Sequence, residues 1–196
     1  MSFDCPVWPP NWPEIDASVQ RVLGSGDWGR YHSETCEGLR ARIAEFTGVS
    51  EVRLCCSGTA ALEIALRAAQ VGQGDEVVLA AYDFPGNFRT VELLGARPVL
   101  LDVAAGSISI DPQQLQSVAP GEESSRSRAV IASHLYGRPA DVTRLREVCD
   151  ARGWIFVEDA CQAIGMTMGG QQAGGGGHFA TLSFGGSKPV SAGGGG

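Results

Sequence analysis

The sequence contains almost no lysine and no long apolar run. Lys188 is the single lysine among 15 basic Lys and Arg residues. No apolar stretch approaches the roughly 18–20 residues that a membrane-spanning helix needs. The first residues lack the basic start and the apolar core of a secretory signal peptide. We therefore expect a cytoplasmic protein that does not act in a membrane.

Clustered positive charge and metal-binding patterns are also missing. The formal net charge is −7 and no basic run occurs, which argues against nucleic acid as a partner. The six cysteines form no CxxC pair, and the three histidines do not share metal-ligand spacing. We therefore expect no metal site, and we interpret most of the cysteines as small core residues in a reducing compartment.

Strand-like and helix-like segments alternate along most of the chain. A Pro- and Trp-rich arm and a helix come first, so we expect residues 1–30 to form an N-terminal arm and residues 31–196 one larger unit. The alternation predicts an α/β fold with a mostly parallel sheet between helices. The expected strands are 52–56, 76–80, 97–102, 129–133, 154–157 and 179–183. The expected helices are 13–23, a segment between Ser33 and Gly48, 59–69, 85–94, 112–118 and one from Asp141 to Arg152.

Three groups of polar residues follow expected strands, where parallel sheets bind ligands. Ser57-Gly58-Thr59 opens a helix, so it is either an anion site or a plain N-cap. Asp159 either caps the next turn or holds a protonated ring nitrogen, and Gln162 faces the same way. Lys188 stands between glycines, where an amine could form a Schiff base with an aldehyde. A solvated surface lysine is the alternative, but an anion site, an acid and a lysine together are what pyridoxal 5'-phosphate (PLP) requires.

Two other glycine motifs resemble known nucleotide- and phosphate-binding motifs, but their neighbouring residues do not fit those motifs. Residues 24–29 fit GxGxxG, but they follow a helix rather than a strand, so we interpret them as a turn. Residues 185–188 resemble a phosphate-binding loop, but Pro189 stands where that loop needs a hydroxyl. The glycine runs 174–177 and 193–196 are either flexible linker or active-site loops, and we prefer the loops.

Taken together, these segments resemble the DegT/DnrJ/StrS family of PLP-dependent sugar aminotransferases. They follow one another in that family's order and spacing from about Gly24 onward. The segments that carry the resemblance are 57–62, 72–78, 81–84, Asp102, 134–137, 158–163 and 183–188.

The resemblance implies a cofactor and a role for each site residue. The fold is expected to be the large domain of a fold-type I PLP-dependent transferase, incomplete at its C-terminus and without the small C-terminal domain. Lys188 then binds PLP as a Schiff base and moves the proton, and Asp159 pairs with the ring nitrogen. The remaining cofactor-binding residues are expected to be Gly58, Thr59, Ala60, Phe84, Gln162 and Ser183.

The resemblance also implies a reaction. An amino acid, glutamate or glutamine, gives its amino group to a keto-sugar nucleotide or a keto-cyclitol. The expected enzyme is a homodimer, and the fragment 1–196 alone is expected to be inactive. A non-catalytic PLP-fold regulator and a dehydratase or lyase of the same fold are the alternatives. One departure is Asp83, which stands where the family commonly has Thr or Ser.

Overall fold

The structure is a computed structural model that describes residues 7–8, 10–118 and 126–196, with the backbone alone for 126–128. Of the expected N-terminal arm, residues 1–6 and 9 lie outside this part. Contacts divide the chain into two compact units, Met1–Leu54 and Cys55–Gly196. The expected division into 1–30 and 31–196 stays a prediction. No helix of the described part combines the length and the apolar character that crossing a membrane requires.

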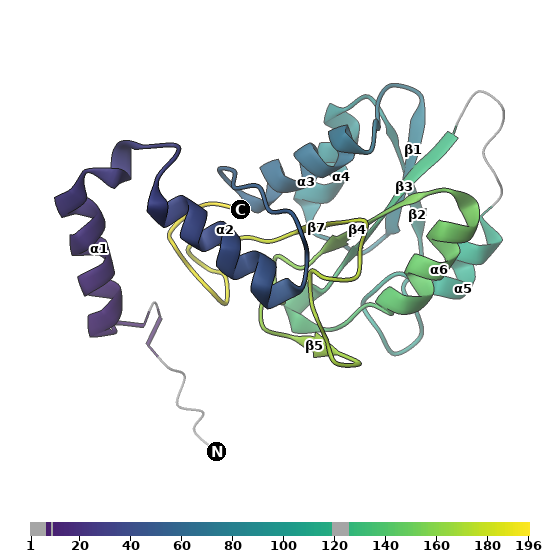
Figure 1. Cartoon of the computed structure of the whole chain (residues 1–196). Helices are drawn as coiled ribbons and strands as arrows, with labels where there is room; N and C mark the ends of the chain where they lie inside the picture. The colour runs from purple at the N-terminus through teal and green to yellow at the C-terminus, as the bar shows by residue number, and fades with distance from the viewer. Residues whose placement is uncertain (1–6, 9, 119–125) are drawn as a thin grey trace, which may run out of the picture. The chain divides into compact units, whose positions relative to one another are not determined.

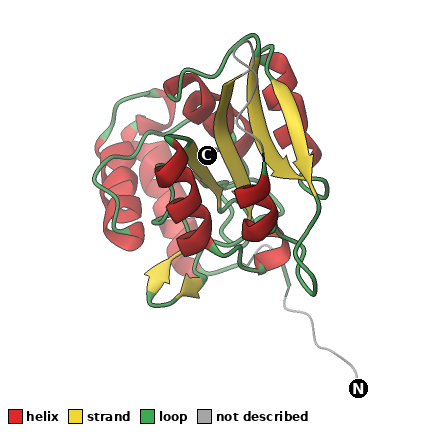
Figure 2. Cartoon of the chain, turned by 90° about the vertical axis from the view of Figure 1, so that its right-hand side faces the viewer, coloured by secondary structure: helices red, strands yellow, loops and turns green. Residues whose placement is uncertain are grey.

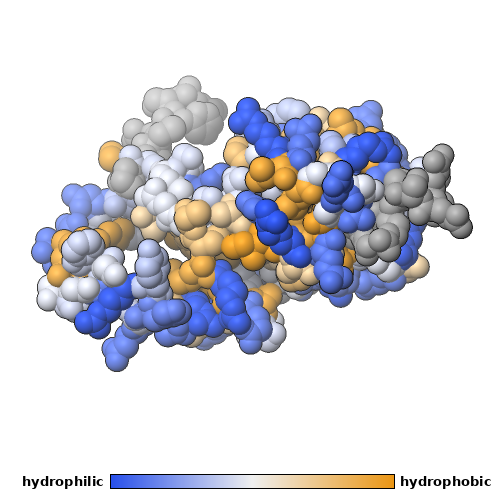
Figure 3. All heavy atoms as spheres, turned by 90° about the horizontal axis from the view of Figure 1, so that it is seen from above, coloured by the Kyte–Doolittle hydropathy of each residue, from blue (hydrophilic) through white to orange (hydrophobic). Residues whose placement is uncertain are grey.

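The first unit consists of helices. Its elements are α1 (Pro13–Ser25), the short 3-10 helix η1 (Asp27–Gly29) and α2 (Glu34–Thr47). As predicted, Ser33 caps α2, because its hydroxyl accepts the N–H of Cys36 at 3.2 Å. Gly48 ends the helix with φ 76°, a conformation that favours glycine. Helix α1 buries none of its residues, and its apolar side chains lie at the surface among strongly polar ones (Figure 3).

The second unit is built on one parallel sheet. Its strands are β1 (Asp75–Ala80), β2 (Arg97–Leu101), β3 (Arg126–Ser133), β4 (Ile155–Asp159) and β7 (Phe179–Thr181). They lie in the order β2-β1-β3-β4-β7, and every neighbouring pair is parallel. The sheet twists between helices, as Figure 1 and Figure 2 show. The predicted α/β fold with a mostly parallel sheet is confirmed.

Helices cover both faces of this sheet. On one face, α3 (Gly58–Ala68) and α4 (Pro85–Leu93) bury a core with the side chains of β1, β3 and β4 that point towards them. On the other, α5 (Pro112–Ser117) and α6 (Val142–Arg152) pack on a second core that includes the fully buried Phe156. Because both faces are covered, β1 is buried along its whole length.

Two local expectations differ from the structure. The expected strand 52–56 does not form. In the second unit, Cys55 exchanges backbone hydrogen bonds with Gly196 at 2.9 and 3.1 Å, and Ser57 forms an isolated bridge with Gly195, which is too short a pairing for a strand. A two-residue hairpin, β5 (Thr167–Met168) with β6 (Gln171–Gln172), and the short 3-10 helix η2 (Leu135–Gly137) were not predicted.

Candidate active site

A pocket lies where the carboxyl ends of the strands meet the starts of two helices. The end of β4, the segments that follow β4 and β7, and the first turns of α3 and α4 contribute its lining. Seven of the eight predicted cofactor-binding residues line it: Gly58, Thr59, Phe84, Asp159, Gln162, Ser183 and Lys188. The eighth, Ala60, does not line the pocket, and its N–H donates to the Ser57 hydroxyl at 3.1 Å.

One end of the pocket is the start of helix α3. Ser57 caps the helix, so both readings of this segment can hold at once. The N–H groups of Gly58 and Thr59 have no acceptor within the described part of the chain. Free N–H groups at the positive end of a helix dipole attract an anion. The geometry therefore suits a phosphate.

Gly58 has no room for a side chain. A Cβ there would lie 2.7 Å from Sγ of Cys161 and 2.9 Å from Cβ of Ser183. Only glycine lets α3 approach the segments that follow β4 and β7 this closely. The close approach brings the buried Ser183 hydroxyl beside the start of α3.

Lys188 and Phe84 lie together in the pocket. The Lys188 ammonium is 5.7 Å from the centroid of the Phe84 ring, within cation–π range. Phe84 caps α4, and its ring folds over Gly86, where a Cβ would meet ring carbon Cε1 at 2.5 Å. Phe84 remains 42% exposed and lines the pocket, so part of its side chain can contact a ligand beside the lysine.

Asp159 ends strand β4 as a buried carboxylate with four hydrogen-bond donors. Oδ1 accepts the Cys161 N–H and the Thr181 hydroxyl, both at 3.1 Å. Oδ2 accepts the Asn87 amide at 3.0 Å and the Ser133 hydroxyl at 3.3 Å. These donors come from the strands β3 and β7, the helix α4 and the turn after β4, so they fix the orientation of the carboxylate from several sides.

Two polar residues of the site escaped the sequence analysis. Asn87 lines the pocket from α4, and Ser133 ends β3 beside Asp159. The signal for Asn87 was its position three residues after Phe84 on a helix, which places the two on neighbouring turns. Gln162 also contacts the segment after β3, because its Oε1 accepts the N–H of Tyr136 in η2 at 2.8 Å.

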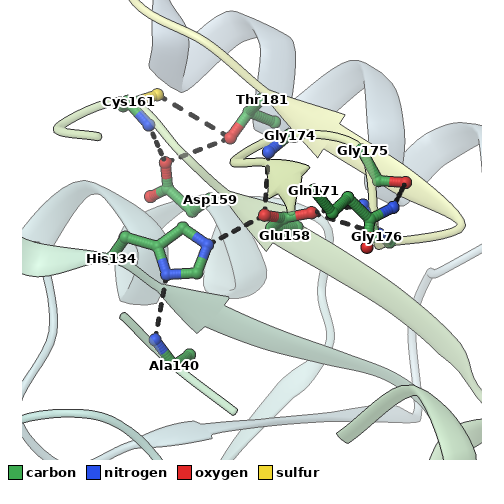
Figure 4. Close-up of polar contacts among 11 residues, drawn as sticks. His134, Ala140, Glu158, Asp159, Cys161, Gln171, Gly174, Gly175, Gly176 and Thr181 are labelled. Atoms are coloured by element: carbon green, nitrogen blue, oxygen red, sulfur yellow. Dashed lines mark hydrogen bonds and ion pairs between the residues drawn. The ribbon is translucent and has the colours of Figure 1, made fainter. Parts of the chain in front are cut away.

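Glu158, the neighbour of Asp159, points the other way and organises the glycine run 174–177 (Figure 4). Successive strand residues face opposite sides of a sheet, so the two carboxylates have separate tasks. Glu158 is fully buried and accepts the N–H groups of Gly174, Gly176 and Gly177 at 2.8, 2.8 and 3.2 Å. Nε2 of His134 lies 2.8 Å from Oε1 of Glu158 and forms its fourth hydrogen bond.

The proton of His134 is placed by its second partner. Its Nδ1 accepts the Ala140 N–H at 3.0 Å, so Nε2 carries the hydrogen and donates to Glu158. Burial alone raises the pKa of Glu158, but the hydrogen bonds from His134, Gly174 and Gly176 outweigh it and leave the pKa below its usual value. The ionised Glu158 therefore holds the loop that leads into β7 and on to Lys188.

Two further groups next to Asp159 have raised pKa values. Burial raises the pKa of the Cys161 thiol, and the negative charge of Asp159 adds to the effect, so the thiol stays protonated. Burial also raises the pKa of Asp83 to about 6, although the neighbouring Ser133, Phe84 N–H and Asn87 hold it lower. The negative charge of Asp159 contributes to this rise.

Taken together, the site is that of a PLP-binding protein with an α/β fold. A phosphate fits the open N–H groups of α3, a planar ring fits beside the partly exposed Phe84, and a ring N–H fits the anchored carboxylate of Asp159. Lys188, which lines the same pocket, has an amine that could hold such a cofactor covalently. The residues present thus fit the group that the sequence predicted.

Comparison with known proteins gives the family. The profile of the DegT/DnrJ/EryC1/StrS aminotransferase family matches residues 11–196, and the chain belongs to this family. It is 36% identical over 172 residues to the erythromycin biosynthesis sensory transduction protein EryC1 of Saccharopolyspora erythraea, which is 87% of this chain and 45% of that protein. It is 36% identical over 198 residues to the L-glutamine:2-deoxy-scyllo-inosose aminotransferase of Streptomyces kanamyceticus, at 97% and 45% coverage.

Solved structures agree with the family and its cofactor. The aminotransferase of Psychrobacter cryohalolentis superposes with a TM-score of 0.87 at 28% identity, covering 97% of this chain and 47% of that one. Spr1654 of Streptococcus pneumoniae, 26% identical with a TM-score of 0.81, covers 98% of this chain and 52% of its own in a PLP form, and it is also known in a PMP form. PLP is the cofactor of this family's aminotransferases. The chain spans about half the length of the curated relatives it matches.

Proposed function

We propose that the protein is a PLP-dependent aminotransferase. The observation that carries the proposal is one pocket that holds the single lysine of the chain, an anchored carboxylate and a helix start with open N–H groups. We assign Lys188 as the covalent anchor of the cofactor and Asp159 as the partner of its ring nitrogen. Both assignments are hypotheses about the loaded protein.

Each side chain of the pocket has its own role in the proposed reaction. When bound, PLP draws electrons away from the carbon that carries the amino group, provided that its ring nitrogen is protonated. Asp159 holds that proton through the negative charge of its carboxylate, and the hydrogen-bond donors around it fix its orientation. Lys188 supplies the amine that accepts and returns a proton at the reacting carbon. The Phe84 ring and the start of α3 position the ring and the phosphate.

We infer that the amino donor is glutamate or glutamine and that the acceptor is a keto-sugar nucleotide or a keto-cyclitol. The support is the names of relatives that are 35–36% identical to this chain. One is the UDP-2-acetamido-2-deoxy-3-oxo-D-glucuronate aminotransferase of Pseudomonas aeruginosa, and another is the cyclitol aminotransferase described above. A non-catalytic regulator is disfavoured, because such a protein has no need of Lys188, Asp159 and Gln162 together in one pocket.

The test is a half-reaction with the PLP-loaded protein. Glutamate or glutamine is added without acceptor, and the absorbance of the bound cofactor is followed together with release of the 2-oxo acid. An aminotransferase converts the absorbance band and releases one 2-oxo acid per site. An unchanged band with no 2-oxo acid from either donor, or from a panel of other amino acids, would contradict the proposal.

We further propose a cytoplasmic homodimer. The five cysteines of the described part are all free, which suits a reducing compartment. The dimer follows from the family resemblance. Sedimentation of the PLP-loaded protein measures it, and an active monomer at assay concentration would refute it.

A further inference from the structure

Asp83 and Asp159 form a pair of carboxylates that share one amide. Nδ2 of Asn87 lies 3.1 Å from Oδ1 of Asp83 and 3.0 Å from Oδ2 of Asp159. Asn87 is only 2% exposed, so no bulk water competes for its hydrogens. The two carboxyl groups come from segments 76 residues apart in sequence. The fold therefore brings a second acid directly behind the one that faces the pocket.

The cluster has more acceptors than donors. Nδ2 of Asn87 carries two hydrogens but faces three acceptors, because the Ser133 hydroxyl oxygen also lies at 3.0 Å. The second oxygen of Asp83, Oδ2, is buried and has no hydrogen-bond partner among the described residues. A buried acceptor without a donor is unfavourable by about 1–3 kcal/mol. The cluster thus lacks two donors, one for the three acceptors around Asn87 and one for Oδ2 of Asp83.

The cluster also lacks a cation. Within the described residues, no arginine, lysine or histidine forms an ion pair with Asp83 or with Asp159. Buried carboxylates are ordinarily paired with positive charge. Burial and the charge of Asp159 both favour the protonated form of Asp83 when the cluster is without a cation, and a positive charge beside Asp159 would reverse this. A cationic N–H that binds Asp159 from the pocket side would supply the missing positive charge and one of the missing donors.

We propose that Asp83 is a positioning residue that, through Asn87, sets a second negative charge behind Asp159 and makes the site selective for a protonated ring nitrogen. The inference rests on the proposed function. When a ring N–H binds Asp159, Asn87 can give both of its hydrogens to Asp83 and Ser133, so that each of the three acceptors around Asn87 has a donor. Asp83 then stabilises the ring proton from a position outside the lining of the pocket.

The test compares two ligands that differ in one atom. Dissociation constants are measured for PLP and for 1-deazapyridoxal 5'-phosphate, which has carbon in place of the ring nitrogen. The background is Lys188→Ala, so that neither ligand is held covalently. Asp83→Asn removes the charge and keeps the shape, and Glu92→Gln removes an exposed carboxylate of α4 as the matched control. Asp83→Thr is the second variant, because Thr also removes the charge but has a different shape.

The expected result is a selective loss. Asp83→Asn and Asp83→Thr weaken PLP binding about tenfold, the scale of coupling within one hydrogen-bond network, and leave the deaza ligand within about twofold. Glu92→Gln changes neither ligand. Equal weakening of both ligands would overturn the inference, because Asp83 would then act on the shape of the pocket alone. No weakening of either ligand would overturn it too. If the parent protein with Lys188 intact binds no PLP, the proposed function fails first.

Discussion

Asp83→Asn should remove a pH-dependent loss of stability from the protein. Burial is the main cause that raises the pKa of Asp83 from 3.8 to about 6. The folded protein therefore binds this proton more tightly than the unfolded chain does. Because the folded state holds more protons between about pH 4 and pH 6, its free energy of unfolding falls as the pH rises through that window.

The size of the effect follows from the shift. A shift of about two pKa units corresponds to about 3 kcal/mol, since one unit is about 1.4 kcal/mol. Asparagine cannot ionise, so the variant lacks this term at every pH. Relative to the parent, Asp83→Asn should gain about 3 kcal/mol between about pH 4 and about pH 7.5.

Urea unfolding of the cofactor-free protein at several pH values measures this difference. The quantity compared is the free energy of unfolding of the variant minus that of the parent, so that all other titrating groups cancel to first order. Glu92→Gln serves as the control, because its carboxylate is exposed, and its difference should stay flat. A flat difference for Asp83→Asn as well would refute the reasoning that burial and the charge of Asp159 act on Asp83.

The remaining predictions concern the anchored groups. Glu158→Gln should destabilise the protein by about 3–5 kcal/mol, because one hydrogen of the new amide would face a backbone N–H. The difference in the free energy of unfolding between parent and variant should shrink as the pH falls below about 4.5. Urea unfolding tests this, and an unaffected variant would contradict it. Asp159→Asn should reduce transamination by orders of magnitude while unfolding changes by about 1–3 kcal/mol for its mispaired donors, and a parental rate would show that Asp159 is only structural. Gly58→Ala should weaken inorganic phosphate and PLP binding and destabilise by about 1–3 kcal/mol through its contacts with Cys161 and Ser183. Gly38→Ala, in an open helix position of α2, should do neither, and equal behaviour of the two would exclude a steric cause.

The sequence predicted the sheet and most of its helices because their signals are local. Helix starts such as Ser33 and Ser57 are marked by a hydroxyl that caps the next turn, and both caps form. Buried parallel strands are marked by short apolar runs between turn residues. The expected strand 52–56 failed because a strand needs a partner, and local sequence does not show which segment provides one.

Individual site residues were predictable where they stand next to a strand end. Asp159 ends β4 and Lys188 follows β7, and the topology of a parallel sheet brings such positions together. The carboxylate pair was not predictable, since Asp83 and Asn87 meet Asp159 only after α4 packs on the sheet. The hydrogen bonds of Glu158 to the glycine run 174–177 could not be predicted for the same reason. Its partners in the glycine run are 16–19 residues away in sequence and are joined to it by a loop.

The most direct test of the central claim is the position of the covalent cofactor. The PLP-loaded protein is reduced with borohydride, digested, and mapped by mass spectrometry, with Lys188→Ala treated in parallel. Lys188 should carry the reduced cofactor at one per chain, and the variant should carry none. Cofactor attached at any other amine, or equal labelling of the variant, would contradict the assignment of this pocket as the active site.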